Sequence, residues 1–232
     1  ILAELEEPHV WAYYANHDQI VFHENDFEIF IDPNRDAHAY FELELNAQNT
    51  LFDLFMPKPY RNGGPAITDW DITGFKSAIA VDGTLNNPAD VDVKWSVEVA
   101  ISFKSLTENK KYVNPEDGQY WKINFSRVQW QTEVIDGTYQ KIKDKNTNKY
   151  ISENNWVWSP QGVVNMHCPE RWGLAQFSSD KVDGKSVEFN LPEEEKFSKY
   201  LWLVYYKQQN YRRQNGNYAT SLFELDLQQS IK

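Results

Sequence analysis

The sequence predicts an all-β protein, an antiparallel β-sandwich of the jelly-roll type with one C-terminal helix. Apolar and polar residues alternate with a period of two in segment after segment of the first three quarters of the 232-residue chain. Turn sequences such as Asn62-Gly63, Asp82-Gly83 and Asp136-Gly137 separate these segments. Helical spacing is nearly absent between them, which favours antiparallel pairing over the helical crossovers of a parallel sheet.

Two neighbouring runs, 27–32 and 40–46, give the strongest strand signal. Each alternates strictly, so that one face of the strand is apolar and the other carries polar groups, as in a half-buried strand. The Asp-Pro-Asn-Arg-Asp sequence between them has the chemistry of a turn and favours an antiparallel pair. Alternation also predicts strands at 1–6, 51–55, 75–81, 95–101, 120–130, 156–158 and 173–177.

The remaining segments are an insertion and a helix. Residues 136–155 are polar and lysine-rich and predict an exposed hairpin insertion. Three glutamates, 193–195, follow Pro192 and favour a helix start, and apolar residues at helical spacing extend a helix over about 193–214. We therefore expect a sandwich domain over 1–180 and a C-terminal extension over 181–232, whose helix could dock on the sandwich or contact a partner.

Composition excludes several classes of function. The net charge of −11 repels phosphate backbones, so nucleic acid is not expected as a partner. No apolar run approaches the roughly 20 residues that cross a bilayer, so membrane insertion is not expected. The single cysteine, Cys168, rules out an internal disulfide framework and a thiolate metal cluster. The chain has no signal peptide at its start, which leaves open that one was removed.

Polar residues on the first two strong strands form the candidate site. Glu28, Glu44 and Asn46 share a face, and carboxylates and an amide near aromatic rings suit a polyhydroxylated ligand. Trp158 is a candidate for sugar stacking, although most tryptophans of a sandwich lie in its core. The two glutamates could instead be the acid and base of a glycosidase, or a solvated sheet face. Serine elbows, phosphate loops and zinc spacings are absent, so the protein is expected not to be an enzyme.

A possible metal site lies in the turn after the first strong strand. Asp32, Asn34 and Asp36 have a D-x-N-x-D spacing, which can direct three oxygens at a Ca²⁺ ion. A turn stabilised by its own aspartate and asparagine side chains is the alternative. No cofactor is certain, and a structural Ca²⁺ is the one that the sequence makes conceivable.

Four segments in order, FEIFIDP (27–33), WKINFSR (121–127), WVWSPQG (156–162) and PERWG (169–173), resemble the family-nine carbohydrate-binding modules. The similarity covers about 2–177 and is greater to family-nine-like domains of bacterial proteins, which often lack a catalytic partner. It implies a sandwich that grips the reducing end of a glucan or xylan between two tryptophans, with structural calcium. The family's opening strands are missing before Ile1, and the segment beyond Pro192 is not part of the module.

The spacing from these motifs shows which residues of this chain occupy the family's binding positions. The two stacking positions fall on Phe22 and Met166, neither of them tryptophan. The polar positions fall on Glu28 and Asn46, which match the family, and on three residues that replace other types. These are Glu44 in place of arginine, Asn124 in place of glutamine and Val163 in place of asparagine.

The sequence therefore predicts non-catalytic carbohydrate binding on a sandwich face, in glycan capture or utilisation, by a secreted bacterial protein located outside the cell or in the periplasm. Its partner would be an oligo- or polysaccharide, bound with micromolar to millimolar affinity. Arg127 could pair with Glu44 or Glu28 and hold the carboxylate in orientation, or it could form a purely structural ion pair. The predicted site comprises Phe22, Glu28, Glu44, Asn46, Asn124, Arg127, Trp158 and Met166.

Two alternatives of other classes stay open. Related sandwich domains hold haem, so Met166, His167 or a lysine could be axial ligands of a redox domain. The C-terminal helix, with Trp202, Tyr205 and Tyr206, could instead make this a protein-interaction module.

Overall fold

The computed structural model describes residues 1–106, 114–181, 184 and 187–227. It has two compact units, Ile1–Ser179 and Asp180–Lys232. The first unit holds all the strands of the described residues, in two principal sheets and one small hairpin. The second holds one α-helix. The all-β fold class with a single C-terminal helix is confirmed.

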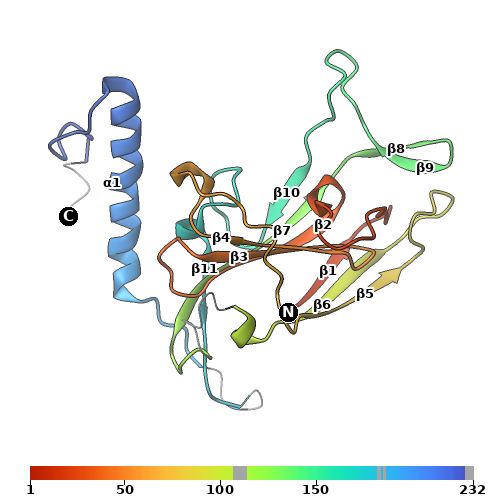
Figure 1. The fold of residues 1–232 in the computed structure, drawn as a ribbon, viewed down its shortest axis with the longest axis horizontal. Helices are drawn as coiled ribbons and strands as arrows, with labels where there is room; N and C mark the ends of the chain where they lie inside the picture. Colours follow the sequence, from red (N-terminus) through yellow and green to blue (C-terminus); the bar gives the residue numbers. More distant parts are fainter. Residues whose placement is uncertain (107–113, 182–183, 185–186, 228–232) are drawn as a thin grey trace. The chain divides into compact units, whose positions relative to one another are not determined.

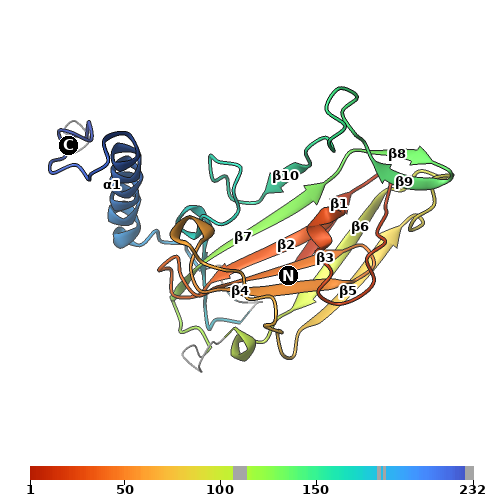
Figure 2. The same ribbon diagram turned by 45° about the horizontal axis from the view of Figure 1, so that its top comes forward.

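The larger sheet has six strands that pair antiparallel throughout. β7, β2, β3 and β4 lie side by side in Figure 2, and β10 and β11 both pair with β7, one toward each of its ends. In spatial order the strands are β10 (Asn154–Val157), β7 (Tyr120–Gln129), β2 (Asp26–Asp32), β3 (Tyr40–Asn46) and β4 (Leu51–Met56), with β11 (Gly173–Gln176) beside β7.

The smaller sheet forms the second layer of the sandwich (Figure 1), and it contains β1 (Leu2–Glu6), β6 (Lys94–Ala100) and β5 (Lys76–Asp82). A separate hairpin consists of β8 (Thr132–Ile135) and β9 (Thr138–Lys141). Its two turn residues, Asp136 and Gly137, have positive φ of 50° and 75°, as the turn of a two-residue hairpin requires. The predicted insertion thus starts at the turn of this hairpin.

The main core lies between the two sheets. The apolar residues of β2 and β3, among them Ile29 and Leu43, pack there against Trp95 and Val97 of β6, and all four are at most 1% exposed. Alternation in the sequence therefore marks this face correctly.

The outer face of the larger sheet is also buried, which differs from the prediction of half-buried strands. Every residue of β2 and β3 is buried. Phe30 and Tyr40 form a second cluster there with Trp172. The cover comes from three 3₁₀-helices and the loops around them: η1 (Val21–His23), η2 (Tyr60–Asn62) and η4 (Pro169–Arg171). Of these, η1 contacts β3 and η4 contacts β7. A fourth, η3 (Phe103–Ser105), lies on the inner side, where the Phe103 ring meets that of Trp121. Long connections that fold back over a sheet leave no signal in the alternation of the strands.

The C-terminal helix α1 spans Glu193–Asn215. Its first turn holds three glutamates, and Gly216, with φ 81°, ends it by donating its N–H to the carbonyl of Arg212. None of the helices in the described residues is long and apolar enough to span a membrane.

A buried carboxylate joins the two sheets. Glu7, which follows β1 and is 4% exposed, accepts hydrogen bonds at Oε2 from Asn25 Nδ2 (3.1 Å), Arg127 Nη2 (2.8 Å) and Gln129 Nε2 (2.9 Å). Arg127 and Gln129 belong to β7 of the other sheet. Glu7 is therefore the anchor of Arg127, so the predicted pairing of Arg127 with Glu44 or Glu28 is wrong.

Removal of this anchor should destabilise the sandwich. We expect Glu7→Ala to lower the free energy of unfolding by about 3–5 kcal/mol, because it leaves the Arg127 guanidinium buried without its counter-charge. Glu4→Ala, which removes the exposed partner of Lys94, should leave the free energy of unfolding nearly unchanged, because water screens an exposed ion pair. Denaturant unfolding followed by tryptophan fluorescence measures both. A Glu7→Ala protein as stable as Glu4→Ala would contradict this account.

Candidate functional site

Three glutamates project from the outer face of two central strands. Glu28 of β2 lies directly opposite Glu44 of β3, and Glu42 precedes Glu44 by two residues on the same face. All three are buried: Glu28 is 6% exposed, Glu44 is 2% exposed and Glu42 is 4% exposed. The structure therefore brings together Glu28 and Glu44 as the alternation predicts, and adds Glu42 to them.

A pocket of about 410 Å³ lies over these glutamates. Its floor is formed by the three carboxylates with Phe52 and Leu54 of β4. Loop residues form its walls, and two aromatic side chains among them are well exposed, Phe22 at 39% and Tyr60 at 51%. The remaining wall residues are Ile20, Ala66, Thr68, Met166 and His167.

Burial raises the pKa values of the floor carboxyls. The pKa of Glu28 rises to about 7, with the Ser126 hydroxyl acting in the opposite direction. The pKa of Glu42 is raised well above its usual range by burial and then by Glu28. The pKa of Glu44 is raised by burial and then by Asp26 and Glu42. The raised pKa values favour the protonated form of these groups, in which a carboxyl can donate as well as accept hydrogen bonds.

The backbone of η1 holds one wall in place. The N–H of Phe22 donates to Glu44 Oε2 (3.2 Å), and the carbonyl of Phe22 accepts from Trp130 Nε1 (2.9 Å). The Phe22 ring meets the ring of His23 edge-on, with 4.6 Å between the ring centroids. The aromatic wall is thus tied directly to the acidic floor.

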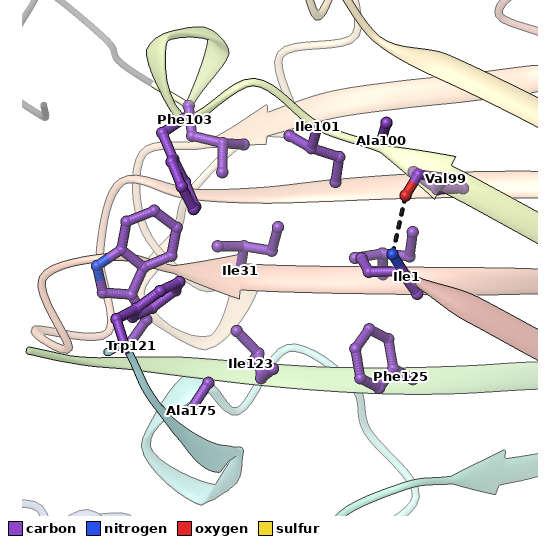
Figure 3. Close-up of a pocket in the computed structure, with 13 residues that line it drawn as sticks. Ile1, Ile31, Val99, Ala100, Ile101, Phe103, Trp121, Ile123, Phe125 and Ala175 are labelled. Carbon is purple, nitrogen blue, oxygen red and sulfur yellow. Dashed lines mark hydrogen bonds between the residues drawn. The ribbon is translucent and has the colours of Figure 1, made fainter. Parts of the chain in front are cut away.

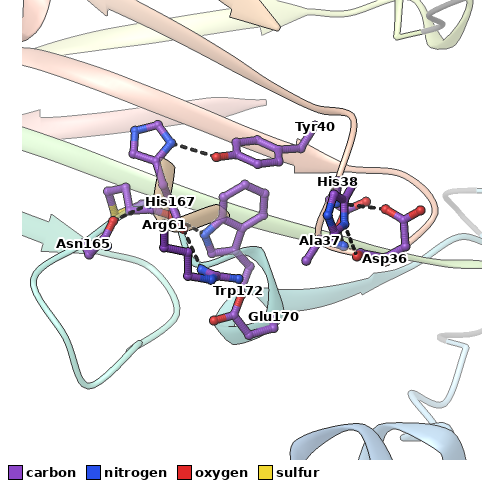
Figure 4. Close-up of polar contacts among 11 residues, drawn as sticks. Asp36, Ala37, His38, Tyr40, Arg61, Asn165, His167, Glu170 and Trp172 are labelled. Atoms are coloured by element: carbon purple, nitrogen blue, oxygen red, sulfur yellow. Dashed lines mark hydrogen bonds and ion pairs between the residues drawn. The ribbon is translucent and has the colours of Figure 1, made fainter. Parts of the chain in front are cut away.

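A polar network holds the other wall (Figure 4). The Tyr40 hydroxyl and His167 Nδ1 are hydrogen-bonded at 2.9 Å, and Arg61 joins the His167 carbonyl (3.0 Å) to the Glu170 carboxylate (2.7 Å). Trp172 Nε1 donates to the Met166 carbonyl (2.8 Å). These contacts fix a loop that has no regular secondary structure.

The side chains of this wall face the acidic floor. The Tyr60 ring meets the His167 ring edge-on at 4.5 Å between centroids. His167 Nε2 lies 3.8 Å from Glu42 Oε2. Met166 and His167, which the haem alternative names as ligands, already have protein partners. Met166 Sδ accepts a hydrogen bond from Gln161 (3.0 Å), and His167 is hydrogen-bonded to Tyr40. The haem alternative stays a prediction.

Four predicted site residues line the pocket, namely Phe22, Glu28, Glu44 and Met166. The amides of Asn46 and Asn124 bond the protein instead. Asn46 Nδ2 donates to the Tyr14 carbonyl (2.9 Å), and its Oδ1 accepts from Thr50 N (3.0 Å) and Gln48 N (3.0 Å).

Asn124 has the same kind of role as Asn46. It joins β7 to the loop after β10, because its Nδ2 donates to the Ser159 carbonyl (3.1 Å) and its Oδ1 accepts from Ser159 N (2.9 Å). Both asparagines are fully buried and shape the backbone around the site.

Arg127 and Trp158 lie on the other face of the larger sheet. The register pairs Glu28 with Ser126 and Phe27 with Arg127, so Arg127 points away from the glutamates. Trp158 packs edge-on against Phe125 at 5.7 Å between centroids and is 56% exposed. Val163 lines a neighbouring hollow that shares Met166 and His167 with the pocket.

Three of the pocket residues that fall outside the predicted site have side chains suited to contact a ligand, Glu42, His167 and Tyr60. Glu42 has the same alternation as Glu44 and could have been found from it. The sequence predicts His167 only as a possible haem ligand. Tyr60 lies in η2, after a proline and outside any periodic segment, so the sequence carries no signal for it.

The turn at 32–36 is stabilised by its own side chains. Asp32 Oδ1 accepts from Arg35 N (2.9 Å) and Oδ2 from Ala37 N (2.9 Å), while Asn34 Nδ2 donates to Asp36 Oδ2 (2.8 Å). Burial raises the pKa of Asp32 to about 7. The alternative of a side-chain-stabilised turn describes these contacts, and a Ca²⁺ ion there stays a prediction.

A second cavity, of about 470 Å³, lies between the two sheets (Figure 3). Ile101 and Phe103 line one side, and Ile31, Trp121 and Ile123 line the other. The lining is almost wholly apolar, so it offers a polyhydroxylated ligand few partners. The pocket over the three glutamates is the better candidate for such a ligand.

No protein-family model and no curated protein matches the sequence. Among solved structures, the chain is similar to a "putative carbohydrate-binding protein" from Bacteroides uniformis ATCC 8492, with 17% identity and a TM-score of 0.49 over 76% of this chain and 69% of that one. It is also similar to a family 9 carbohydrate-binding module from Caldicellulosiruptor kristjanssonii in complex with cellotriose, with 14% identity and a TM-score of 0.37 over 82% and 73%. Both likenesses are weak, so the argument for function rests on the pocket itself.

The buried histidine of the wall should make stability depend on pH. Burial lowers the pKa of His167 from 6.5 to about 4. Between these values the unfolded chain binds a proton that the folded protein does not, so stability is lost as the pH falls. On going from pH 7 to about pH 4.5, wild type should lose about 2–3 kcal/mol more than His167→Gln.

Denaturant unfolding of both proteins at the two pH values measures this difference. Carboxyl groups with raised pKa values act in the opposite direction, but they are present in both proteins and largely cancel in the comparison. An equal loss in wild type and His167→Gln would show that His167 is protonated in the fold.

Proposed function

We propose that this domain binds a saccharide, without catalysis, in the pocket over Glu28, Glu42 and Glu44. The observation that carries the proposal is the combination of a floor of carboxyl groups with exposed aromatic rings at the wall. The volume of about 410 Å³ is within the range of roughly 300–1,000 Å³ that small-molecule sites occupy.

The chemistry of the pocket suits sugar hydroxyls. Protonated carboxyl groups both accept and donate hydrogen bonds, as a hydroxyl also does. The rings of Phe22 and Tyr60 offer flat apolar faces to the C–H groups of a pyranose. Met166, at the position where the family-nine modules have a tryptophan, adds a flexible apolar surface.

The placement of the carboxyls argues against glycoside hydrolysis. A glycosidase needs its acid and its second carboxylate on either side of the scissile bond. Glu28, Glu42 and Glu44 all rise from one face of two adjacent strands, so they meet a ligand from the same side. This placement supports binding without hydrolysis. We propose that the binding serves the capture of glycans outside the cell or in the periplasm.

Substitutions in the pocket test the proposal. A glycan array identifies a ligand, and calorimetry gives its dissociation constant, expected between about 1 μM and 1 mM. Tyr60→Ala should weaken binding about tenfold by removing an aromatic face, equivalent to about 1.4 kcal/mol. Glu44→Gln should weaken it by at least as much, because it removes an acceptor at the centre of the floor.

Trp156→Ala is the matched control, since Trp156 is 62% exposed and pairs in register with Arg127, whose side chain points to the other face of the sheet. Its dissociation constant should equal that of wild type. Circular dichroism and melting temperature check that each variant is folded. A ligand whose binding is weakened by Trp156→Ala and not by Tyr60→Ala or Glu44→Gln would refute this site.

A further inference from the structure

A tight group of three carboxylates includes two residues of the pocket, Glu28 and Glu44. One carboxylate oxygen from each of Asp26, Glu28 and Glu44 lies within 4.8 Å of the other two. Asp26 and Glu28 alternate along β2 on the same face, and Glu44 faces Glu28 across the strand pair. These three residues are called the acidic trio below.

The negative charge of the acidic trio has no counter-charge in the described residues. No lysine or arginine of this part of the chain forms an ion pair with any of the three. Asp26 is fully buried and Glu28 is 6% exposed, yet Asp26 Oδ2 and Glu28 Oε2 have no hydrogen-bond partner there. Burying a carboxylate oxygen without a partner is costly in free energy. These two oxygens therefore favour the binding of a ligand.

The other contacts of the acidic trio come from backbone N–H groups and from uncharged or acidic side chains, among them the Ser126 hydroxyl beside Glu28. Val128 N donates to Asp26 Oδ1 (3.3 Å), and Phe22 N donates to Glu44 Oε2 (3.2 Å). These bonds orient the carboxylates and do not neutralise them. The surrounding carboxylates, Glu24 and Glu42, increase the repulsion on Asp26.

We propose that the acidic trio binds one divalent cation, with Ca²⁺ preferred over Mg²⁺. Ca²⁺ takes carboxylate oxygens at about 2.3–2.6 Å in irregular geometry, so oxygens on opposite sides of the ion can lie up to about 5 Å apart. Mg²⁺ requires a tighter octahedron and gives up its water reluctantly. Glu28 and Glu44 also line the pocket, which gives the ion a path and leaves positions for water.

Another acidic group in the described residues is less suited to this role. His17, Asp18, Asp53 and Asp71 also lie close together, but all except Asp53 are exposed. Both oxygens of Asp53 already have partners, Ile72 N at 2.6 Å and His17 Nε2 at 2.9 Å. This group therefore provides a control that also contains clustered carboxylates.

Metal titration of the whole protein tests the proposal without any saccharide. Protein stripped with EDTA is titrated with CaCl₂ and with MgCl₂ by calorimetry, and its melting temperature is compared in Ca²⁺ and in EDTA. Wild type should bind about one Ca²⁺, more tightly than Mg²⁺, and should melt at a higher temperature in Ca²⁺.

Isosteric variants of the acidic trio should lose the Ca²⁺ binding and the stabilisation by Ca²⁺. Glu28→Gln and Asp26→Asn should each weaken Ca²⁺ binding at least tenfold and abolish the rise in melting temperature. In EDTA, each variant should melt at or above the temperature of wild type, because one buried negative charge is gone. A variant that had merely lost its structure would melt lower in both conditions.

Asp71→Asn is the control and should bind Ca²⁺ as wild type does. The proposal is overturned if wild type shows no Ca²⁺ binding, if Glu28→Gln and Asp26→Asn keep it, or if Asp71→Asn loses it. Saccharide binding is measured separately in EDTA and in Ca²⁺. Failure of cation binding is therefore distinguishable from failure of the saccharide proposal.

Discussion

The burial of β2 and β3 on both faces is the constraint on which the rest of the structure depends. One face forms the core between the sheets, and its alternating apolar residues need no further explanation. The other face carries Glu28, Glu42 and Glu44 and is also removed from water. Loops fold over this face, held by contacts such as Phe22 N to Glu44 and Arg61 to Glu170. The pocket exists because this cover is incomplete over the glutamates.

Much of the sandwich can be predicted from the local alternation of apolar and polar residues in the sequence. The period-two runs predict the strands, and the same period places Glu28 and Glu44 on one face, because adjacent antiparallel strands align their side chains in register. The wall of the pocket follows no such rule. Tyr60 and His167 reach it through irregular loops, whose paths depend on contacts such as that between Tyr40 and His167, over a separation of 127 residues.

The misplaced residues show where counting along motifs is insufficient. Arg127 follows Ser126, which shares the face of the glutamates, by one place in β7, and Trp158 comes one place after the end of β10. One step in a strand moves a side chain to the other face. Asn46 and Asn124 are on the correct face. Their amides are short and close to the backbone, and both satisfy the polar groups of adjacent loops instead of a ligand.

The charge of the acidic floor can be neutralised in more than one way. These ways depend on one another because they use the same carboxylate oxygens. Protons, a cation at the acidic trio and ligand hydroxyls would all use oxygens of Glu28 and Glu44. Two occupants that bind the same oxygens exclude each other, whereas a cation that leaves a coordination position open to a hydroxyl would favour the ligand. Linkage requires each effect to be reciprocal, so the influence of Ca²⁺ on saccharide affinity must equal that of the saccharide on Ca²⁺ affinity. The sign of that coupling tells whether the cation and the saccharide compete for these carboxylates or bind together.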